Sequence, residues 1–314
     1  MTRQPGDKSD PDHDEAAGDH PAEAETKTER EGERETEDQD FVPVILKRTD
    51  EALKHPDDIL NTAIAEGLEQ LLRPVLSLFL SALAAGLILG FTAMSVAIVQ
   101  AQLLVLDLPV PARLATALVY PLGFVLCIMC GTQLFTEHTA SAVYPVLDRR
   151  GTPAQLLRLW ATVLVGNLIG ALLSSGLLVA ADPVINAEAG YVEIGRHLVM
   201  YSGGALFISA LLAGWLMALG AWLVLATSPS LSQMASIYIV TFIIGIGGLH
   251  HSIAGSVEIF TAYLISDQFL LAEVAAFLGM TIIGNLVGGS IFVALLNYGH
   301  IRETQKRSSV TQGD

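Results

Sequence analysis

Long apolar runs separated by short polar stretches fill the chain from about residue 75 to residue 300. They divide into six segments, at about 75–103, 113–147, 159–181, 197–226, 237–265 and 272–298. A membrane-spanning helix needs about 20 predominantly apolar residues. The pattern therefore predicts an all-α membrane protein with six transmembrane helices.

The second and fifth segments are predicted to be broken helices. The second is too long for a single crossing and contains Gly131 and Gln133, while the fifth reads GIGGLHHSIAGSVEIF over residues 245–260. An ionisable group within a span costs free energy to bury and by default marks a functional site. Irregular backbone at that depth is tolerated only where it lines a cavity. His251, near the middle of the fifth segment, is therefore the candidate centre of a transport site.

A short repeat relates the two halves of the chain. GNLIG at residues 166–170 and GNLVG at 284–288 each follow a broken segment. Three spans plus three spans is the simplest description, and halves with an odd number of spans are inverted relative to each other. Alignment by the spacing of the two motifs pairs GTQLFT, residues 131–136, with LHHSIA, residues 249–254. The two interruptions then meet near the membrane midplane.

Composition divides the chain into four parts. It is 52% hydrophobic and 16% charged, yet residues 1–40 are almost wholly polar and hold most of the acid behind the net charge of -15. We predict a disordered acidic tail over 1–40, a solubilising tail or a regulatory arm, with no cleavable signal before it. An amphipathic surface segment over 41–74 follows, with a helix at 57–72. The six-span domain covers 75–300, and a polar tail covers 301–314.

Charge predicts the orientation in the membrane. Lys and Arg gather before the first span, in the predicted loop 148–158 and at the C-terminus, whereas the predicted loop 182–195 and the loop after the fifth span are acidic. Under the positive-inside rule both termini lie in the cytoplasm, with the protein as a multi-pass component of the cell membrane.

Three motifs carry a resemblance to a known family. LFT at residues 134–136, the paired GN-x-x-G motifs and H-S-I-A at 251–254 occur in the order and on the spans found in the formate/nitrite transporter family, over about residues 55–300. The resemblance implies an aquaporin-like fold and a homopentamer with one pore per protomer. It also implies passage of formate, nitrite or similar monovalent anions, with membrane lipid as the surroundings and neither a cofactor nor nucleic acid as a partner.

The resemblance also implies roles for residues. His251 lies centrally in the pore, residues 131–136 form a bent loop beside it, and Phe135 is one apolar constriction, with Leu249 nominated for the other. The predicted pore residues are His251, Thr136, Phe135, Leu134, Gln133, Leu249 and His250. The predicted break and packing residues are Gly131, Gly248, Gly255, Asn167 and Asn285.

The chain departs from the family pattern in ways that remove groups able to attract an anion. His250 stands where family members carry an acidic residue, and Gly255 and Gly214 stand where they carry asparagine. The fourth span has no upstream lysine, only Arg196 and His197 at its mouth. The sequence therefore indicates a divergent branch of the family.

The expected chemistry follows from the cost of dehydration. A small anion in a narrow apolar pore loses hydration worth many kcal/mol, so the neutral acid crosses more easily. His251 can donate a hydrogen bond or a proton, with Thr136 or a freed backbone carbonyl fixing its tautomer. Half-helix N-termini at Thr136 and Ser252 would add positive potential at the pore centre.

Several polar groups keep alternative interpretations. His250 can leave the pore, because adjacent helical residues face different ways. Glu137, His138 and Glu258 form interhelical pairs or line a vestibule. Asn167 and Asn285 hydrogen-bond between helices. Neither a metal site from His138 and His251 nor metal chemistry at Cys127 and Cys130 is expected, and the favoured role of the cysteines is packing as small buried side chains that face neighbouring helices.

The leading function is a channel or transporter for small anions of weak acids. The alternative is an aquaporin-type channel for neutral solutes, although neither half contains an N-P-A triplet, or a non-conducting relative. An enzyme is not expected, because no cofactor motif and no nucleophile with a partner is present.

Overall fold

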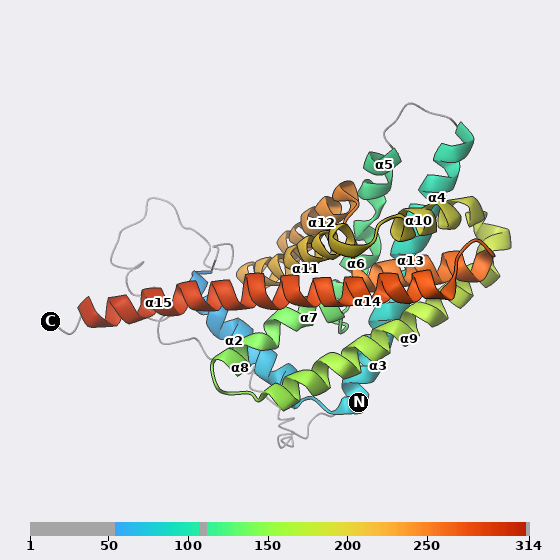
Figure 1. Cartoon of the computed structure of the whole chain (residues 1–314). Coiled ribbons are helices and arrows are strands. Elements are labelled where there is room, and N and C mark those ends of the chain that lie inside the picture. The colour runs from blue at the N-terminus through green and yellow to red at the C-terminus, as the bar shows by residue number, and fades with distance from the viewer. Residues whose placement is uncertain (1–53, 107–111, 312–314) are drawn as a thin grey trace, which may run out of the picture. The chain divides into compact units, whose positions relative to one another are not determined.

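The computed structural model describes residues 54–106 and 112–311. The predicted acidic tail 1–40 and the first part of the predicted segment 41–74 lie outside the described residues. All regular structure in the described part of the chain is helical (Figure 1).

The helices follow one another with short connections. They are α2 Pro56–Leu72, α3 Val75–Ile88, α4 Gly90–Leu106, α5 Ala112–Val119, α6 Pro121–Met129, α7 Phe135–Ser141, α8 Val143–Leu147, α9 Pro153–Ile185, α10 Glu188–Met200, α11 Gly203–Ala226, α12 Ser230–Gly247, α13 Ser252–Ile265, α14 Leu271–Val287, the π-helical η2 Gly288–Leu295 and α15 Leu296–Thr311. Within the described ranges, six helices are long and apolar enough to cross a membrane: Val75–Val105, Ala112–Met129, Pro153–Ile185, Gly203–Ala226, Ser230–Gly247 and Leu271–Ile291. The predicted all-helical membrane protein with six spans is confirmed.

Both predicted helix breaks are present. The first separates α6 from α7 and contains Gly131 at φ 64°, and the second separates α12 from α13 and contains Gly248 at φ 59°. This left-handed conformation disfavours residues with a Cβ, and glycine there commonly ends a helix. The two glycines therefore stop the incoming helices and let the chain re-enter as the short helices α7 and α13.

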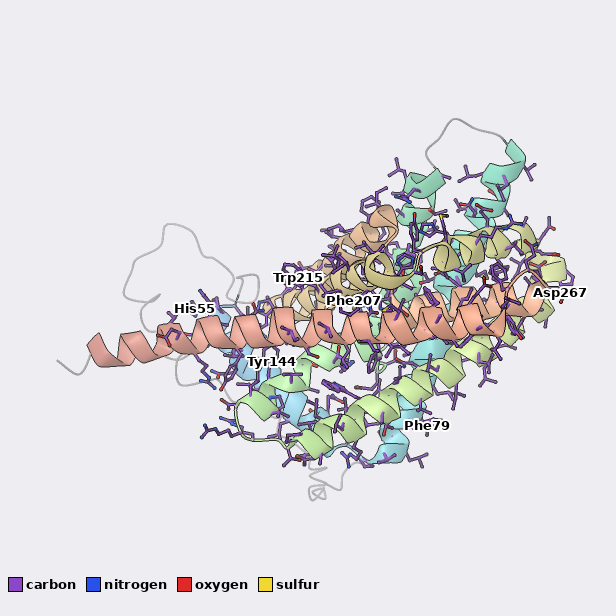
Figure 2. All side chains as sticks on the ribbon, in the orientation of Figure 1. His55, Phe79, Tyr144, Phe207, Trp215 and Asp267 are labelled. Carbon is purple, nitrogen blue, oxygen red and sulfur yellow. The ribbon has the colours of Figure 1, made fainter. Side chains whose placement is uncertain are left out.

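The two halves pack their helices in the same way. A Cβ on Gly166 of α9 would lie 2.7 Å from the Ala82 Cβ of α3, and a Cβ on Gly284 of α14 would lie 2.6 Å from the Ala210 Cβ of α11. The same added atoms would lie 3.0 Å from the carbonyl oxygens of Phe79 and Phe207. Figure 2 labels both phenylalanines. Small residues let helix backbones approach closely in lipid. The GN-x-x-G motifs thus build equivalent helix contacts, which supports the three-plus-three repeat.

Two surface helices differ from expectation. The predicted helix 57–72 exists as α2, but its apolar face is buried against the protein, where Leu60 and Ile64 pack with Tyr144 and Ile301. The predicted loop 182–195 was wrong, because it contains most of α10, including Glu188 and Glu193, while Asp182 and Pro183 lie at the end of α9.

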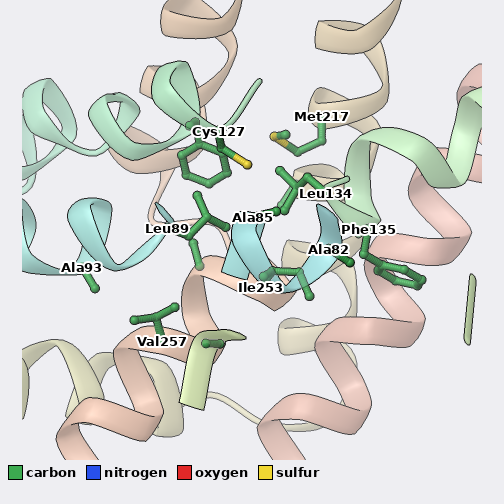
Figure 3. Packing of buried hydrophobic residues seen from close by; sticks show 14 of the residues in the cluster. Ala82, Ala85, Leu89, Ala93, Cys127, Leu134, Phe135, Met217, Ile253 and Val257 are labelled. Carbon is green, nitrogen blue, oxygen red and sulfur yellow. The ribbon is translucent and has the colours of Figure 1, made fainter. Parts of the chain in front are cut away.

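The core lies around the two breaks. Figure 3 shows Leu134, which precedes α7, and Ile253, in the first turn of α13, among Leu89 between α3 and α4, Cys127 of α6 and Met217 of α11. Each of these side chains is at most 2% exposed. Side chains from both halves therefore close around the point where the half-helices meet.

Close helix packing predicts a difference between two glycines of α9. A Cβ on Gly170 would overlap the Leu83 carbonyl oxygen, whereas one on Gly176 meets no described atom within 4 Å. We expect Gly170→Ala to lower stability by about 1–3 kcal/mol through overpacking. Gly176→Ala should leave it unchanged or slightly raised, since alanine is the better helix former. Thermal unfolding of the purified variants in detergent measures both, and equal melting temperatures would contradict the proposed close contact.

Candidate functional site

Asn167 holds the first helix break in place. Its Oδ1 accepts the Phe135 backbone N–H at 2.8 Å, which is the first N–H of α7. Its Nδ2 donates to the Gln133 carbonyl at 2.8 Å and to the Ala82 carbonyl of α3 at 2.7 Å. One buried amide thus satisfies a backbone group within the break and one at the start of α7, and ties both to the first span.

Asn285 does the same at the second break. It accepts the Ser252 N–H at 2.7 Å and donates to the carbonyls of His250 at 3.1 Å and Ala210 at 2.6 Å. These bonds correct the sequence alignment by one residue, because Gln133 corresponds to His250 and Phe135 to Ser252. The separation from the break to the asparagine is 34 residues in the first half and 35 in the second. This extra residue is what the spacing of the GN motifs could not reveal.

His251 sits at the point where the half-helices meet. It is the N-cap of α13, and its Nδ1 accepts the Ala254 N–H at 3.1 Å. Because Nδ1 accepts, the neutral ring carries its hydrogen on Nε2, which lies 2.7 Å from the Thr136 hydroxyl oxygen and donates to it. The ring is 1% exposed, and the edge-to-face ring of Phe124 covers it with centroids 4.9 Å apart.

A cavity of about 290 Å³ leads to this histidine. Its lining residues are Val96, Gln100, Ala112, Arg113, Thr116, Tyr120, Glu193, Ile194, His197, Leu198, Ile244, Gly245, Gly248, Leu249, His251 and Glu258. Exposure falls along it, from exposed Arg113 and half-buried Glu193 to Glu258 and His251, at 5% and 1%. The cavity therefore has a polar mouth and a buried inner end.

The mouth carries an unpaired cation. No hydrogen bond or ion pair joins Arg113 to another residue in the described ranges, and its guanidinium lies beside Gly248 and His197. Burial, and secondly the charge of Arg113, lower the pKa of His197 below its ordinary value. His197 is therefore neutral near pH 7, and Arg113 supplies the positive charge there.

Most of the other predicted pore residues are buried around the breaks. Gln133 donates from Nε2 to Gln70 of α2 at 2.8 Å, and its Oε1 is buried without a hydrogen-bond partner in the described part of the chain. Leu134 and Phe135 are 0% and 2% exposed, and their side chains leave the chain on different sides in Figure 3. Leu249 is half-buried and lines the cavity next to His251.

His250 belongs to a cluster beside the cavity. Its Nδ1 lies 2.7 Å from the Ser209 hydroxyl, and its buried Nε2 has no hydrogen-bond partner among residues 54–106 and 112–311. Its ring stacks on His197 with centroids 5.8 Å apart and meets Tyr201 and Phe277 edge-on. It does not line the cavity that reaches His251.

The departures from the family pattern have packing consequences. A Cβ on Gly214 would overlap backbone atoms of Asn285, so glycine lets α11 approach the asparagine that holds the second break. A Cβ on Gly255 would lie 2.7 Å from the Phe277 ring. Neither position has room for an asparagine in this packing.

Glu137 and His138 lie on α7, away from the cavity. Glu137 Oε2 is 3.9 Å from His138 Nδ1, which is also 3.1 Å from the Leu134 carbonyl. Cys127 is buried and contacts the Thr132 hydroxyl, but Cys130 is exposed, so the expected burial was wrong for Cys130. Residues 54–106 and 112–311 contain no group of three or more His, Cys, Asp or Glu side chains placed to hold a metal ion.

Three residues of the site were missed by sequence reasoning: Phe124, Tyr120 and Arg113. All three precede the first break and meet His251 or its cavity only in the folded chain. Apolar periodicity does not distinguish a pore-lining ring from a core ring. The charge of Arg113 at the start of a span was the one available signal.

Comparisons with known proteins point in one direction. The family model described as formate/nitrite transporter matches residues 57–299. The chain is similar to the inner membrane protein YfdC of Escherichia coli K12, with 32% identity over 244 residues that cover 76% of each chain. Two solved structures have the same fold: an FNT family ion channel (TM-score 0.71, 19% identity, 78% of this chain and 99% of that one) and a pentameric formate channel with formate bound (TM-score 0.62, 20% identity, 71% and 96%).

Proposed function

This chain belongs to the formate/nitrite transporter family, whose members are channels and transporters rather than enzymes, and on that premise we propose that it conducts formate or a similarly small monovalent anion of a weak acid. The observation that carries the proposal is the cavity, which joins a cation at its mouth to a hydrogen-bonding pair at its buried end. The formate named for one structural neighbour fits the same size class.

The path starts at Arg113. An exposed, unpaired guanidinium in a cleft raises the local concentration of anions, and a carboxylate or nitrite oxygen can accept its hydrogen bonds. Arg113 thereby provides the cation that the fourth span lacks. Beyond it the lining is largely apolar, with Val96, Ile244 and Leu249, so the anion loses water as it descends.

His251 and Thr136 receive the substrate at the inner end. His251 donates from Nε2, and the Thr136 hydroxyl hydrogen has no acceptor among the described residues. The pair can turn one donor toward the substrate while Ala254 holds the ring in place. In this scheme His251 is a hydrogen-bond donor, and Phe124, Leu134 and Phe135 limit the width of the pore.

Orientation and assembly complete the proposal. Figure 2 shows His55, which caps α2, and Asp267, which follows α13, at opposite ends of the view. Three arginines lie near α2, at the end of the molecule that His55 marks. Arg73 bonds to Gln70 of α2, Arg158 donates to the Leu71 carbonyl, and Arg302 donates to Asp148, which follows α8. By the positive-inside rule that end faces the cytoplasm, together with both termini, and the cavity opens outward. A homopentamer, as in the formate channel of known structure, is the assembly we propose.

A neutral-solute channel is the second candidate. Two carboxyl groups, Glu193 and Glu258, line the same cavity and oppose an anion when charged. Uptake of labelled formate and nitrite into proteoliposomes, beside glycerol and water flux, separates the two. Glycerol or water flux without uptake of either anion would overturn the anion proposal.

Arg113 gives a prediction with a matched control. Arg113→Gln should raise the formate concentration for half-maximal uptake roughly tenfold, since electrostatic focusing by a cleft is of that order. Arg113→Lys should keep most of the wild-type affinity. Arg196→Gln removes an exposed arginine on the same side, bonded to Glu193 and Gln268, and should change it by less than about twofold. Equal effects of Arg113→Gln and Arg196→Gln would show that only net surface charge matters.

A further inference from the structure

Glu258 is a buried acid on α13. It is 5% exposed, and no hydrogen bond or ion pair joins its carboxyl to another residue in the ranges that the structure describes. Buried carboxyl groups are normally paired or hydrogen-bonded, because an isolated charge there is very costly. A carboxyl kept in this position without a partner is therefore a candidate for a working group.

The helix directs Glu258 into the same cavity as His251. The two residues are seven apart, so they lie two turns apart on one face of α13, with a rise of about 10 Å between them. Both line the cavity, and Tyr120, which also lines it, packs at a tilt against the Phe124 ring that covers His251. A substrate moving inward thus passes Glu258 in the same space that ends at His251.

His251 is poorly placed to supply a proton. Its Nδ1 holds the Ala254 N–H, and its neutral ring cannot release the Nε2 hydrogen without becoming an anion. To act as an acid it must first gain a proton on Nδ1, which breaks the cap of α13. A carboxyl group has no such constraint, since it can give and regain a proton through water in the cavity.

We propose that Glu258 is the proton donor of this pore and makes it an anion/proton symporter. The inference rests on the proposed anion function. The Glu258 acid gives its proton to an oxygen of formate, so one O–H bond breaks and another forms. Neutral formic acid passes the constriction at His251 and Phe124 and releases the proton to cytoplasmic water. The Glu258 carboxylate then takes a proton from hydronium that enters through the mouth, so one proton crosses with each anion.

Few other charged groups face Glu258. Arg113 and Tyr120 come from α5 and its junction with α6, Glu193 and His197 from α10, and His251 from α13 itself. The helices α3, α4, α7, α9 and α14, which also pack against α13, contribute no charged side chain to the described lining. Glu193 is the only other carboxyl group among these lining residues, but it is half-exposed and bonded to Arg196 at 3.1 Å. It is the matched control.

The test compares initial formate uptake into proteoliposomes over a range of external pH, with a luminal dye reporting proton entry and protein-free vesicles subtracted. Wild-type uptake should rise with acidification to a plateau. Glu258→Gln should lower it at least about 100-fold, the lower end of the range for a lost proton donor, and should abolish the rise of uptake with acidification. Glu258→Asp should retain that dependence with a shifted midpoint. Glu193→Gln can change the rate, because it removes a charge from the cavity mouth, but it should keep the pH midpoint of the wild type.

Each outcome decides between the proposals. If the wild type moves formate and Glu258→Gln, assembled like the wild type on size exclusion, keeps its rate and pH profile, the inference is overturned while the anion function stands. Faster uptake by Glu258→Gln also overturns it, since the carboxylate would then be a barrier. If Glu258→Gln fails to assemble, the midpoint of Glu258→Asp decides, because only a proton donor shifts it. If the wild type moves neither formate nor nitrite, the proposed function itself fails.

Discussion

Replacing His251 with asparagine should reduce formate uptake by roughly 5- to 150-fold, the range for leaving one buried hydrogen-bonding group unsatisfied at about 1–3 kcal/mol. Asparagine is a good N-cap, so its side chain can still accept the Ala254 N–H and keep the start of α13. It is too short to reach the Thr136 hydroxyl from the same position. The variant therefore removes the pore-centre donor with little damage to the helix break.

Two further variants define the cause of the loss. Thr136→Val removes the hydroxyl that accepts from His251 and should also slow uptake, because the Nε2–H then lacks its partner and the substrate loses the second donor. His300→Asn, on the exposed part of α15, should have no effect. Initial uptake rates in proteoliposomes at one pH measure all three. Full activity of His251→Asn would move the substrate site away from the junction of the half-helices.

The sequence was sufficient to predict the features that local signals encode. Span length follows from apolar runs, and the break at Gly248 follows from a glycine beside polar residues in an apolar segment, because both depend on a few adjacent residues. The repeat also follows, since Asn167 and Asn285 stand in nearly identical motifs. Their function as clamps on the two breaks requires contacts with residues 32 to 35 positions away, together with carbonyls of α3 and α11.

Other features depend on tertiary contacts that no local pattern records. Arg113 and His251 stand far apart in the sequence, and only the packing of α5 against α12 brings both to one cavity. The helix α10 was obscured because acidic residues and Pro183 dominate the composition, although Tyr191, Val192 and Leu198 have helical spacing and are buried. The role of Glu258 was similarly ambiguous. A glutamate that pairs with another span and a glutamate that lines a cavity look the same in the sequence.

Replacing Asn285 with alanine should have a large effect on stability. The substitution leaves the Ser252 N–H and the carbonyls of His250 and Ala210 without partners inside the protein. Each orphaned buried group costs about 1–3 kcal/mol, so we expect a loss of about 3 kcal/mol or more. The melting temperature in detergent should fall by about 6–12 °C, and uptake should disappear because His251 no longer has a fixed position.

The inverted repeat supplies both a second test and a control. Asn167→Ala should be as damaging as Asn285→Ala, since it makes the equivalent three bonds at the first break. Thr281→Val changes a fully buried side chain of the same helix α14, but the Thr281 hydroxyl bonds only to carbonyls of its own helix, so its loss should cost under about 1 kcal/mol. If Asn285→Ala melted like Thr281→Val, the asparagine would be a packing residue. If only one asparagine variant were damaging, the two breaks would not be energetically equivalent, and the half with the larger loss would be the one whose clamp fixes the pore centre.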